Sequence, residues 1–252
     1  MITLEKFNAI CWIWITVGFL LFPVLLKVKQ PYGRHTTSKW GMMIKNELGW
    51  FLMELPALLI FGYFFVITPD SGNYLVLVAG TLWGLHYIHR ALIFPFRLKT
   101  KGKKMPVIIV GFAIFFNTIN GLLNGYWLAN FSNEIASKPL FEIRLMTGIV
   151  IFLAGFVINQ YHDHLLLKLR KDNRGYQIPY RGLFKYVSCP NYLGEIISWL
   201  GFFVVTLSLP ALSFLIWTMV NLIPRALDHH KWYRKEFSNY PLERKAIIPY
   251  IL

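Results

Sequence analysis

Residues 183–201, LFKYVSCPNYLGEIISWLG, run from a polar loop into an apolar helix that carries two polar side chains. Ser188 is a candidate N-cap for a helix that begins near Cys189, and the proline that follows falls in the first turn, where its missing N–H costs little. The four-residue spacing places Asn191 and Glu195 on one face of this helix. Because a carboxylate on an otherwise apolar helix is expensive, something in the folded chain must compensate for Glu195.

The composition is that of a membrane protein. The chain has 252 residues, of which 56% are hydrophobic and 17% aromatic, and its mean hydropathy is +0.47, which leaves too little polar surface to cover a soluble globule. The net charge of +14 could suit nucleic acid, but the basic residues are confined to short gaps between apolar runs, where they set membrane topology. We therefore expect no nucleic-acid partner. The two cysteines, Cys11 and Cys189, allow no disulfide framework and no Cys-based metal site.

Seven apolar runs approach the roughly 20 residues that a helix needs to cross a bilayer. They cover residues 7–26, 48–67, 74–96, 106–128, 146–167, 192–207 and 209–226. The sequence thus predicts an all-α integral membrane bundle of seven transmembrane helices. No repeat or long linker divides it, so residues 1–252 form a single predicted domain. The gap 168–185 and the tail 228–252 are rich in Tyr, Trp, Ile and Pro, and we expect both to fold back over the bundle.

The gaps between these runs alternate in charge. Five basic residues follow the first run and five follow the third, and a further basic gap follows the fifth, whereas residues 68–73 and 208–210 carry no basic residue. The positive-inside rule then puts the N-terminus outside and the C-terminus in the cytosol. The same rule applies in the bacterial inner membrane and in the endoplasmic reticulum, so both locations stay open.

Charged and amide side chains inside the runs are candidates for a functional site, because each charged group costs ~2.5 to 3.5 kcal/mol on insertion scales. The candidates are Glu54, His86, Tyr87, His89, Arg90, Asn117, Asn120, Asn124, Asn159, Asp163, Asn191 and Glu195. Asn159, Asp163 and Arg170 are spaced along one helical stripe, and Arg225, His229 and Tyr233 recur every four residues along another. We expect these stripes to face each other.

Structural roles compete with functional ones at several of these positions. Asn117 and Asn124 could simply bond a neighbouring helix, and at least one of His86 and Arg90 could snorkel to the cytosolic interface. We interpret the lysines of residues 99–104 as orientation and lipid contacts only. Glu54 is harder to dismiss, because its own run contains no basic residue and it must find a partner or stay protonated.

Several cofactor and metal motifs are absent from the sequence. No GxGxxG follows a predicted strand, no GxxxxGK[ST] is present, and no HExxH is present. His162, Asp163 and His164 are consecutive, so on a helix they point about 100° apart and cannot converge on one ion. We therefore expect no metal site.

Laid out in this way, the chain resembles the steroid 5α-reductase family of membrane reductases. The stretches that carry the resemblance are PYGRH at 31–35, ELPAL at 54–58, HYIHR at 86–90, NGLLNGYWL at 120–128, LFKYVSCPNYLGEIISWLG at 183–201, RALDHHKWY at 225–233 and RKAIIPYIL at 244–252. The resemblance is stronger from residue 120 to the end, which implies that the C-terminal part, about 120–252, forms the cofactor-binding portion. It implies NADPH-dependent reduction of the Δ4 double bond of a 3-oxo steroid.

The resemblance also implies a catalytic pair, Glu54 and Tyr87. Hydrogen bonds from this pair to the 3-oxo oxygen would draw electrons through the enone, so that C5 accepts hydride and an enolate develops at the oxygen. Tyr87 would donate, and Glu54, kept protonated by desolvation, would orient Tyr87 or donate as well. Trp50, Met53 and Asn120 are the implied substrate contacts.

The family's NADPH contacts correspond to a larger set in this chain. They are Asn159, Asp163, Arg170, Tyr176, Asn191, Glu195, Arg225, His229 and Tyr233. Arg170, Lys171 and Arg225 are candidates for the phosphates, since guanidinium groups bind phosphate in bidentate fashion. Met53 and Gln177 depart from the usual residues of the mammalian enzymes, which puts one steroid contact and one phosphate contact in question.

Other functions remain open on the sequence. CPNYLGE at 189–195 also resembles isoprenylcysteine carboxyl methyltransferases and sterol double-bond reductases. The substrate could therefore be another sterol or a polyprenoid lipid, and a methyltransferase would use S-adenosylmethionine. A non-enzymatic lipid-binding or transport bundle, with the intramembrane acids as a proton relay, is a further alternative. No protein partner is implied, and the bilayer is the expected environment.

Overall fold

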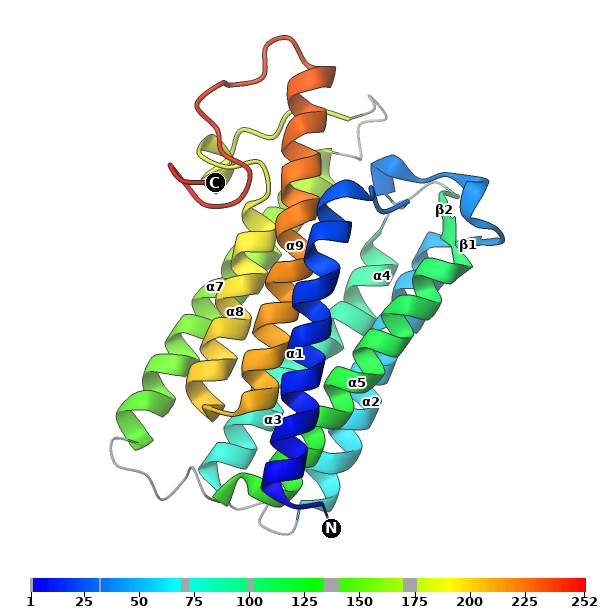
Figure 1. The fold of residues 1–252 in the computed structure, drawn as a ribbon. Helices are drawn as coiled ribbons and strands as arrows, with labels where there is room; N and C mark the ends of the chain where they lie inside the picture. The colour runs from blue at the N-terminus through cyan, green and yellow to red at the C-terminus, as the bar shows by residue number, and fades with distance from the viewer. Residues whose placement is uncertain (1, 32, 69–72, 99–101, 134–140, 170–175) are drawn as a thin grey trace.

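The computed structural model shows one long bundle of helices that run roughly along a common axis (Figure 1). It describes residues 2–252 except 32, 69–72, 99–101, 134–140 and 170–175. The N-terminus lies at one end of the bundle, and the C-terminus folds against the opposite end (Figure 1). The two ends of the described chain therefore lie on opposite sides of the apolar body.

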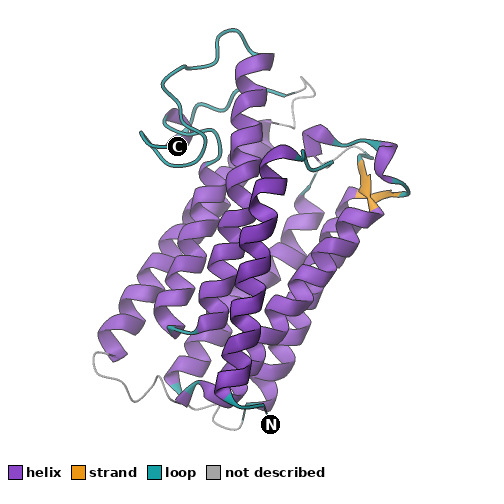
Figure 2. Cartoon of the chain, viewed as in Figure 1, coloured by secondary structure: helices purple, strands orange, loops and turns teal. Residues whose placement is uncertain are grey.

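Helices account for most of the described chain (Figure 2). Their bounds are α1 Leu4–Lys27, α2 Asn46–Ile67, α3 Tyr74–Tyr87, a π-helical turn Ile88–Ile93, α4 Phe94–Arg97, α5 Val107–Phe131, α7 Phe141–Leu169, α8 Pro190–Thr206 and α9 Leu209–Glu236. Short 3-10 turns cover Gly33–His35, Ser38–Trp40 and Gly182–Lys185. The strands β1 (Met43–Lys45) and β2 (Lys104–Pro106) pair antiparallel, Met43 opposite Pro106, and tie the starts of α2 and α5 together.

Six of the described helices are long and apolar enough to cross a membrane: α1, α2, the continuous segment Tyr74–Arg97, α5, α7 and α9. They match six of the seven predicted runs, and α8 occupies the seventh with 17 residues. The helical class is confirmed, and the six candidate spans agree with the predicted membrane bundle. The count of seven spans stays a prediction, because α8 is short for a full crossing.

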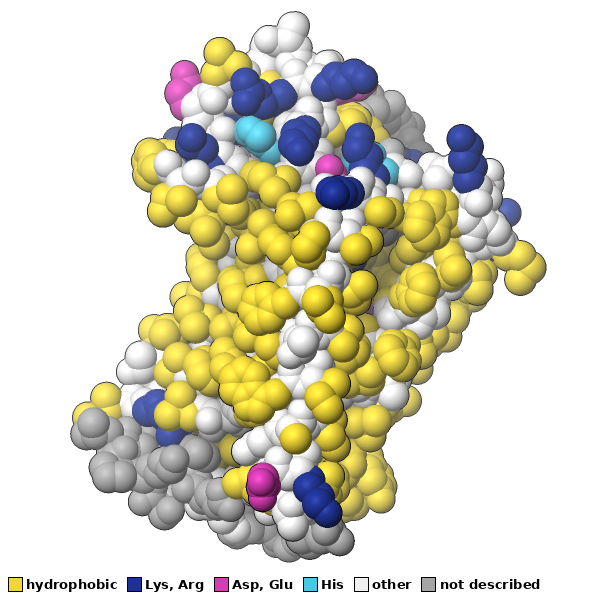
Figure 3. Space-filling model, in the orientation of Figure 1, with side chains coloured by type: hydrophobic (Ala, Val, Ile, Leu, Met, Phe, Trp, Pro, Cys, Tyr) yellow, Lys and Arg dark blue, Asp and Glu magenta, His cyan; other side chains and the backbone are white. Residues whose placement is uncertain are grey.

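The outside of the bundle is apolar along most of its length. Figure 3 shows a broad hydrophobic belt on the face in view, with Lys and Arg gathered above it at the end where α9 finishes. Large side chains such as Leu20, Val66 and Val157 are 63% or more exposed, as expected for a surface that faces hydrocarbon rather than water. The molecule therefore has a lipid-facing waist and one strongly basic end.

Helices α7 and α8 approach each other unusually closely. Gly148 and Gly155 of α7 face Gly201 and Gly194 of α8, and a Cβ at any of the four would collide with backbone atoms of the opposite helix. Small residues at helix interfaces permit such close approach in membranes, where van der Waals packing replaces the hydrophobic effect. This glycine seam, defined by these four residues, brings backbone and side-chain polar groups of α7 and α8 into direct contact.

An aromatic cluster fills the centre of the bundle. The Trp83 ring stacks on Phe61 at 4.4 Å between centroids and lies 4.9 Å from the Tyr87 ring. Its indole N–H donates to the Ala57 carbonyl at 3.0 Å, so the buried nitrogen is paired. Trp199 of α8 packs edge-on against Trp83. The ring of Tyr87 is thus held on a rigid support.

The C-terminal tail folds back over the basic end, as the sequence predicts. Lys245 pairs with Val187 in an isolated bridge, and Ser188 and Cys189 donate their N–H groups to the carbonyls of Lys245 and Ala246. Ile247 is fully buried beneath this junction. The tail therefore completes the structure around the start of α8.

Ser188 does not cap α8, and that expectation is wrong. Helix α8 begins at Pro190, as expected, but its N-cap Cys189 makes no side-chain capping bond. The Ser188 hydroxyl lies instead 2.6 Å from His230 Nδ1 and 2.7 Å from the Tyr240 hydroxyl, where it fastens the tail. Burial raises the pKa of the Tyr240 phenol, so the phenol remains neutral and can donate to Ser188.

Candidate functional site

Arg90 lies at the centre of a buried ion cluster. Its guanidinium lies 3.5 Å from Glu54 of α2, 3.5 Å from Asp163 of α7 and 3.6 Å from Glu195 of α8. The four side chains are only 10–14% exposed. One cation thus joins three carboxylates from three helices, in a region where an isolated charge would be costly. Glu54 finds the partner that its own span lacks.

A local change in helix geometry surrounds Arg90. Residues Ile88–Ile93 form a π-helical turn, in which the Phe94 N–H bonds to the His89 carbonyl five residues back. Pro95 has no N–H to continue an α-helical ladder, which accounts for the widened turn before it. π-Helical turns are frequent at functional sites. Above this turn the guanidinium of Arg90 packs on the rings of Trp50, at 4.8 Å from the centroid, and Phe94, at 5.0 Å.

Asn117 of α5 connects the two residues of the predicted catalytic pair. The Asn117 amide donates to Glu54 Oε2 at 3.3 Å and to the Met53 carbonyl at 2.6 Å. The Tyr87 hydroxyl donates to Asn117 Oδ1 at 3.4 Å. Glu54 and Tyr87, 33 positions apart in the sequence, therefore share one hydrogen-bonded partner inside the bundle. Of the two asparagines for which a simple interhelical role was considered, Asn117 joins the site, whereas Asn124 bonds Asn120 of its own helix.

A second set of polar contacts crosses from α7 to α8 beside the glycine seam. Asn159 donates to the Asn191 carbonyl at 2.9 Å and to Glu195 Oε2 at 3.4 Å, and Asn191 donates to Asp163 Oδ1 at 2.9 Å. The described part of the α7 stripe thus meets the polar face of α8, whereas the facing of the α7 stripe and the Arg225, His229 and Tyr233 stripe of α9 stays a prediction. Asp163 and Glu195 also form ion pairs with Arg90, so the hydrogen bonds between α7 and α8 are connected to the Arg90 cluster.

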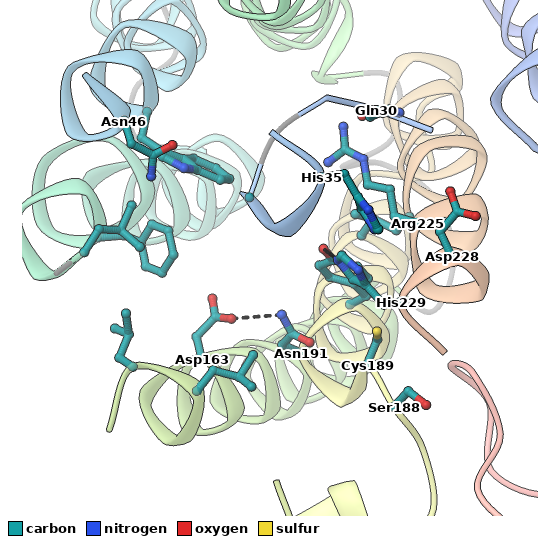
Figure 4. Close-up of a pocket in the computed structure, with 18 of the residues that line it drawn as sticks. Gln30, His35, Asn46, Asp163, Ser188, Cys189, Asn191, Arg225, Asp228 and His229 are labelled. Atoms are coloured by element: carbon teal, nitrogen blue, oxygen red, sulfur yellow. Dashed lines mark hydrogen bonds between the residues drawn. The ribbon is translucent and has the colours of Figure 1, made fainter. Parts of the chain in front are cut away.

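A pocket opens beside this cluster at the basic end of the bundle. It contains about 1180 Å³ of empty space, part of it continuous with solvent. Its lining includes Trp50, Arg90, Asp163, Asn191, Tyr192, Arg225, His229 and Tyr233, with Gln30, Gly33 and His35 from the segment after α1. In Figure 4 the hydrogen bond from Asn191 to Asp163 lies on one wall, while His35, Arg225 and His229 gather on another. The pocket is thus bordered by both predicted stripes.

Aromatic and imidazole rings form much of the pocket's outer part. The His35 and His229 rings are nearly parallel, 5.9 Å apart, and the Tyr192 hydroxyl lies 3.2 Å from His229 Nε2. Tyr233 is buried and stacks on Tyr240 of the tail at 5.3 Å. The tail thereby supports one wall of the pocket.

Arg90 marks the boundary between the pocket and the predicted catalytic pair. Arg90 lines the pocket, whereas Glu54 and Tyr87 lie behind it and do not line it. Trp50, one of the three predicted substrate contacts, lies at this boundary. Met53 packs with Met105 and Val110, and Asn120 is fully buried and donates to the Phe116 carbonyl of its own helix. The structure brings Trp50 and the Met53 backbone to the site, and it gives Asn120 a contact within α5.

Tyr176, another predicted cofactor residue, does not belong to the pocket lining. The ring of Tyr176 packs against Trp232, and Lys103 lies over this ring and 3.4 Å from its hydroxyl. The interpretation of Lys103 as a lipid contact alone is therefore wrong. Arg170 and Lys171 lie outside the described residues.

Sequence reasoning underestimated Arg90 and assigned no role to His35. The snorkelling interpretation fails at both candidate positions, because Arg90 is buried among carboxylates and His86 is 4% exposed against Trp199. Charge counting offered a signal for Arg90: Glu54, Asp163 and Glu195 all lie in apolar runs and require a nearby cation. Nothing local in the sequence signals that residue 35 reaches a pocket lined by α2, α7, α8 and α9. Within the described ranges, no group of three or more His, Cys, Asp or Glu could hold a metal ion.

Comparison with known proteins identifies relatives of this chain. The family model described as 3-oxo-5-alpha-steroid 4-dehydrogenase matches residues 103–252. The steroid 5-alpha-reductase DET2 of Arabidopsis thaliana is 39% identical, with 90% of each chain covered. The 3-oxo-5-alpha-steroid 4-dehydrogenase 1 of Rattus norvegicus is 33% identical over the full length of both chains, and that of Homo sapiens is 33% identical over 96% of this chain and 94% of its own.

Proposed function

Because the chain belongs to the 3-oxo-5-alpha-steroid 4-dehydrogenase family of oxidoreductases, we propose that it uses NADPH to reduce the Δ4 double bond of 3-oxo-Δ4 steroids to 5α-dihydro products. The observation that carries this proposal is the continuous polar cluster within an apolar bundle. Tyr87, Asn117 and Glu54 form one end of it, and Arg90 connects that end to Asp163 and Glu195 beside the pocket. A carbonyl-binding pair and a cofactor pocket are thus adjacent but separate.

The chemistry of the pocket suits a nicotinamide dinucleotide. Carboxamide and carboxylate groups lie on one wall of it, and Arg225, His229 and His35 lie on another (Figure 4). Cationic and imidazole groups suit phosphates, and amide groups suit the carboxamide and ribose of the nicotinamide half. We assign NADPH binding to Asn159, Asp163, Arg170, Tyr176, Asn191, Glu195, Arg225, His229 and Tyr233. The bound cofactor would supply the hydride.

We assign carbonyl recognition to Tyr87 and Glu54. The Tyr87 hydroxyl would donate to the 3-oxo oxygen, which polarises the enone toward C5 and stabilises the negative charge that develops on that oxygen. Asn117 holds the Tyr87 hydroxyl beside the Glu54 carboxyl before substrate arrives, and the single O–H of Tyr87 would turn from Asn117 to the 3-oxo oxygen. Packing of the Tyr87 ring between Trp83 and Trp199 restricts its direction.

The ion cluster offers a means to hold protons near the reacting atoms. Three carboxylates surround one guanidinium, so full ionisation would leave excess negative charge in a region of low dielectric. We propose that water or a carboxyl group of this cluster supplies the proton that reaches C4 after the hydride is delivered to C5.

The arrangement of the ends supports the proposed topology. The termini lie at opposite ends of the bundle, and the pocket opens at the end with the basic residues (Figures 1 and 3). This supports an N-terminus outside, seven spans with α8 as the shortest, and a cytosolic C-terminus, where NADPH is available. The whole chain then acts as one membrane-embedded domain.

A turnover assay tests this proposal. Purified protein in detergent should consume NADPH only when a 3-oxo-Δ4 steroid such as progesterone or testosterone is added, and mass spectrometry should identify the 5α-dihydro product. A steroid whose 3-oxo group is reduced to a hydroxyl is the matched control, because it keeps the ring system and removes the carbonyl. If the protein reduced a polyprenoid or an isolated sterol alkene but no 3-oxo-Δ4 steroid, the proposed substrate would be wrong and the reductase assignment would remain. Saturable S-adenosylmethionine binding without any NADPH oxidation would refute the reductase proposal.

A further inference from the structure

A cluster of basic and imidazole groups, made by Arg97, His89 and His164, does not belong to the pocket lining. Arg97, the last residue of α4, donates from Nη1 to His89 Nε2 at 3.2 Å and from Nη2 to His164 Nδ1 of α7 at 3.3 Å. Within the described residues no carboxylate pairs with Arg97, since the three ion pairs found there all belong to Arg90. Among the described residues, two imidazole nitrogens therefore hold the Arg97 guanidinium, and no carboxylate there offsets its charge.

The π-helical turn is what assembles this cluster. Residues eight apart on an α-helix differ by about 80° in direction, whereas residues seven apart nearly coincide. The one-residue expansion in Ile88–Ile93 lets His89 and Arg97 share a face despite their eight-residue separation. The same turn directs Arg90 inward. The π-helical turn therefore positions both Arg90 in the buried ion cluster and Arg97 beside His89 and His164.

The surroundings of Arg97 are those of a lipid contact. Beside Arg97, the side chains of Phe96 and Ile93 are 73% and 45% exposed. On the neighbouring helix α7, the side chains of Val157 and Tyr161 are 63% and 47% exposed. Along α7 the exposed positions 157, 161, 164 and 168 follow one helical face, so the apolar surface leads up to His164 and then to the exposed Lys168. An apolar strip that ends in a cationic group at the end of two spanning helices matches an acyl chain below a phosphate.

We propose that the seam between α4 and α7 binds an anionic glycerophospholipid, with its headgroup phosphate on Arg97, His164 and Lys168 and an acyl chain along Tyr161 and Val157. His89 fixes the guanidinium from the protein side and leaves the outward N–H groups of Arg97 for the phosphate. The proposal depends on membrane insertion and not on the reaction proposed above. A lipid there would brace the helix that carries Arg90 and Tyr87 against α7.

Thermal unfolding of the full-length protein in neutral detergent tests this site. Added phosphatidylglycerol should raise the unfolding midpoint more than phosphatidylcholine, and native mass spectrometry should show retained phosphatidylglycerol. Each basic group near an anionic lipid contributes about 1 kcal/mol, so Arg97→Gln should lower the phosphatidylglycerol binding constant about fivefold. His164→Asn, at an exposed position, should lower it in the same direction without a risk to folding.

Lys27→Gln is the matched control, because Lys27 is an exposed basic residue in the last turn of α1. This variant should keep the full response to phosphatidylglycerol. Equal stabilisation by both lipids, an undiminished response in both Arg97→Gln and His164→Asn, or an equal loss in Lys27→Gln would each overturn the proposal. An equal rise in midpoint with inorganic phosphate alone would show that the site takes the free anion rather than a lipid.

Discussion

The guanidinium of Arg90 is shared among the carboxylates of Glu54, Asp163 and Glu195. Desolvation of a buried ion pair costs nearly as much free energy as the Coulomb attraction between its charges provides. A cluster of one guanidinium and three carboxylates is therefore poor evidence for stability by itself. Its arrangement is informative in another way, because Glu54 lies on the side of Tyr87 while Asp163 lines the pocket. Under the proposed function, Arg90 connects the carbonyl-binding pair with the cofactor pocket.

Tyr87→Phe should lower turnover by about 10²- to 10³-fold, as expected when one donor to a developing oxyanion is removed. Glu54→Gln should reduce turnover in the same direction, since it keeps the shape and changes the charge and proton content. The binding constant for NADPH should stay within a few-fold of the parent value in both variants, because neither side chain lines the pocket. Steady-state kinetics and NADPH fluorescence titration measure the two quantities separately. Parallel loss of cofactor binding would contradict the assigned division of the site.

Arg90→Gln should destabilise the protein by about 3–5 kcal/mol, because it leaves buried carboxylates without their counter-ion. The measurement is the unfolding midpoint in detergent at fixed lipid content. Arg97→Gln, in the same helical segment but without a carboxylate partner in the described structure, is the control and should change the midpoint far less when no anionic lipid is present. Similar shifts for the two variants would mean that the Arg90 cluster contributes little net stabilisation.

The glycine seam between α7 and α8 determines where the proposed cofactor residues Asn159, Asp163 and Asn191 lie. Without side chains at Gly155 and Gly194, the backbones come close enough for Asn159 to reach the carbonyl of Asn191. Asn191 can then reach Asp163 across the same interface. The order of these polar groups is therefore a consequence of close packing between two apolar helices.

Gly194→Ala should destabilise the protein by about 1–3 kcal/mol, because the added methyl group would meet the backbone of Asn159 and force the helices apart. The affinity for NADPH should fall as well, since Asn159 and Asn191 shift with their helices. Gly62→Ala in α2 is a matched control, because a Cβ there meets nothing within 4 Å. It should leave stability unchanged or raise it by up to about 1 kcal/mol through helix propensity.

Thermal unfolding and cofactor titration of the two glycine variants provide the comparison. Equal behaviour of Gly194→Ala and Gly62→Ala would show that the seam has room to relax. A stability loss in Gly194→Ala without any change in cofactor affinity would instead separate the packing of α7 and α8 from the pocket.

The apolar body of the molecule separates the N-terminal end of the bundle from a basic end that the C-terminal tail covers (Figure 1). The tail is fastened through Ser188, Tyr240 and Lys245, and Tyr240 stacks on the pocket residue Tyr233. The last 16 residues after α9 are therefore part of the support of the pocket rather than an appendage.

A labelling experiment checks the orientation of the whole bundle. A membrane-impermeant maleimide added to sealed vesicles with the periplasmic or luminal face outward should modify Glu5→Cys, in the first turn of α1, and spare Lys235→Cys, in the last turn of α9. Both positions are exposed, whereas the native Cys11 and Cys189 are buried and should stay unlabelled. Lysis should make Lys235→Cys reactive. The reverse pattern would invert the proposed topology.

The apolar runs were sufficient to predict the helices, because a 20-residue hydrophobic segment has few stable alternatives in a bilayer. Errors arose where the solvent or partner of a side chain depends on distant residues. Ser188 matched a capping pattern, yet its hydroxyl is bound by His230 and Tyr240, more than 40 positions away. The Lys103 contact with Tyr176 has the same origin, since no local rule relates residues 73 positions apart.

Hydropathy and motifs were enough to predict a helical membrane protein, the positions of its helices, its family, and the set of polar residues that an apolar bundle must bury. Which of those residues meet depends on how the helices pack. Arg90 was one of several cations near a helix end until the fold enclosed it between Glu54, Asp163 and Glu195. The physical reason is that hydropathy and helical periodicity are properties of a local segment, whereas compensation of a buried charge is a property of the packed helices around it.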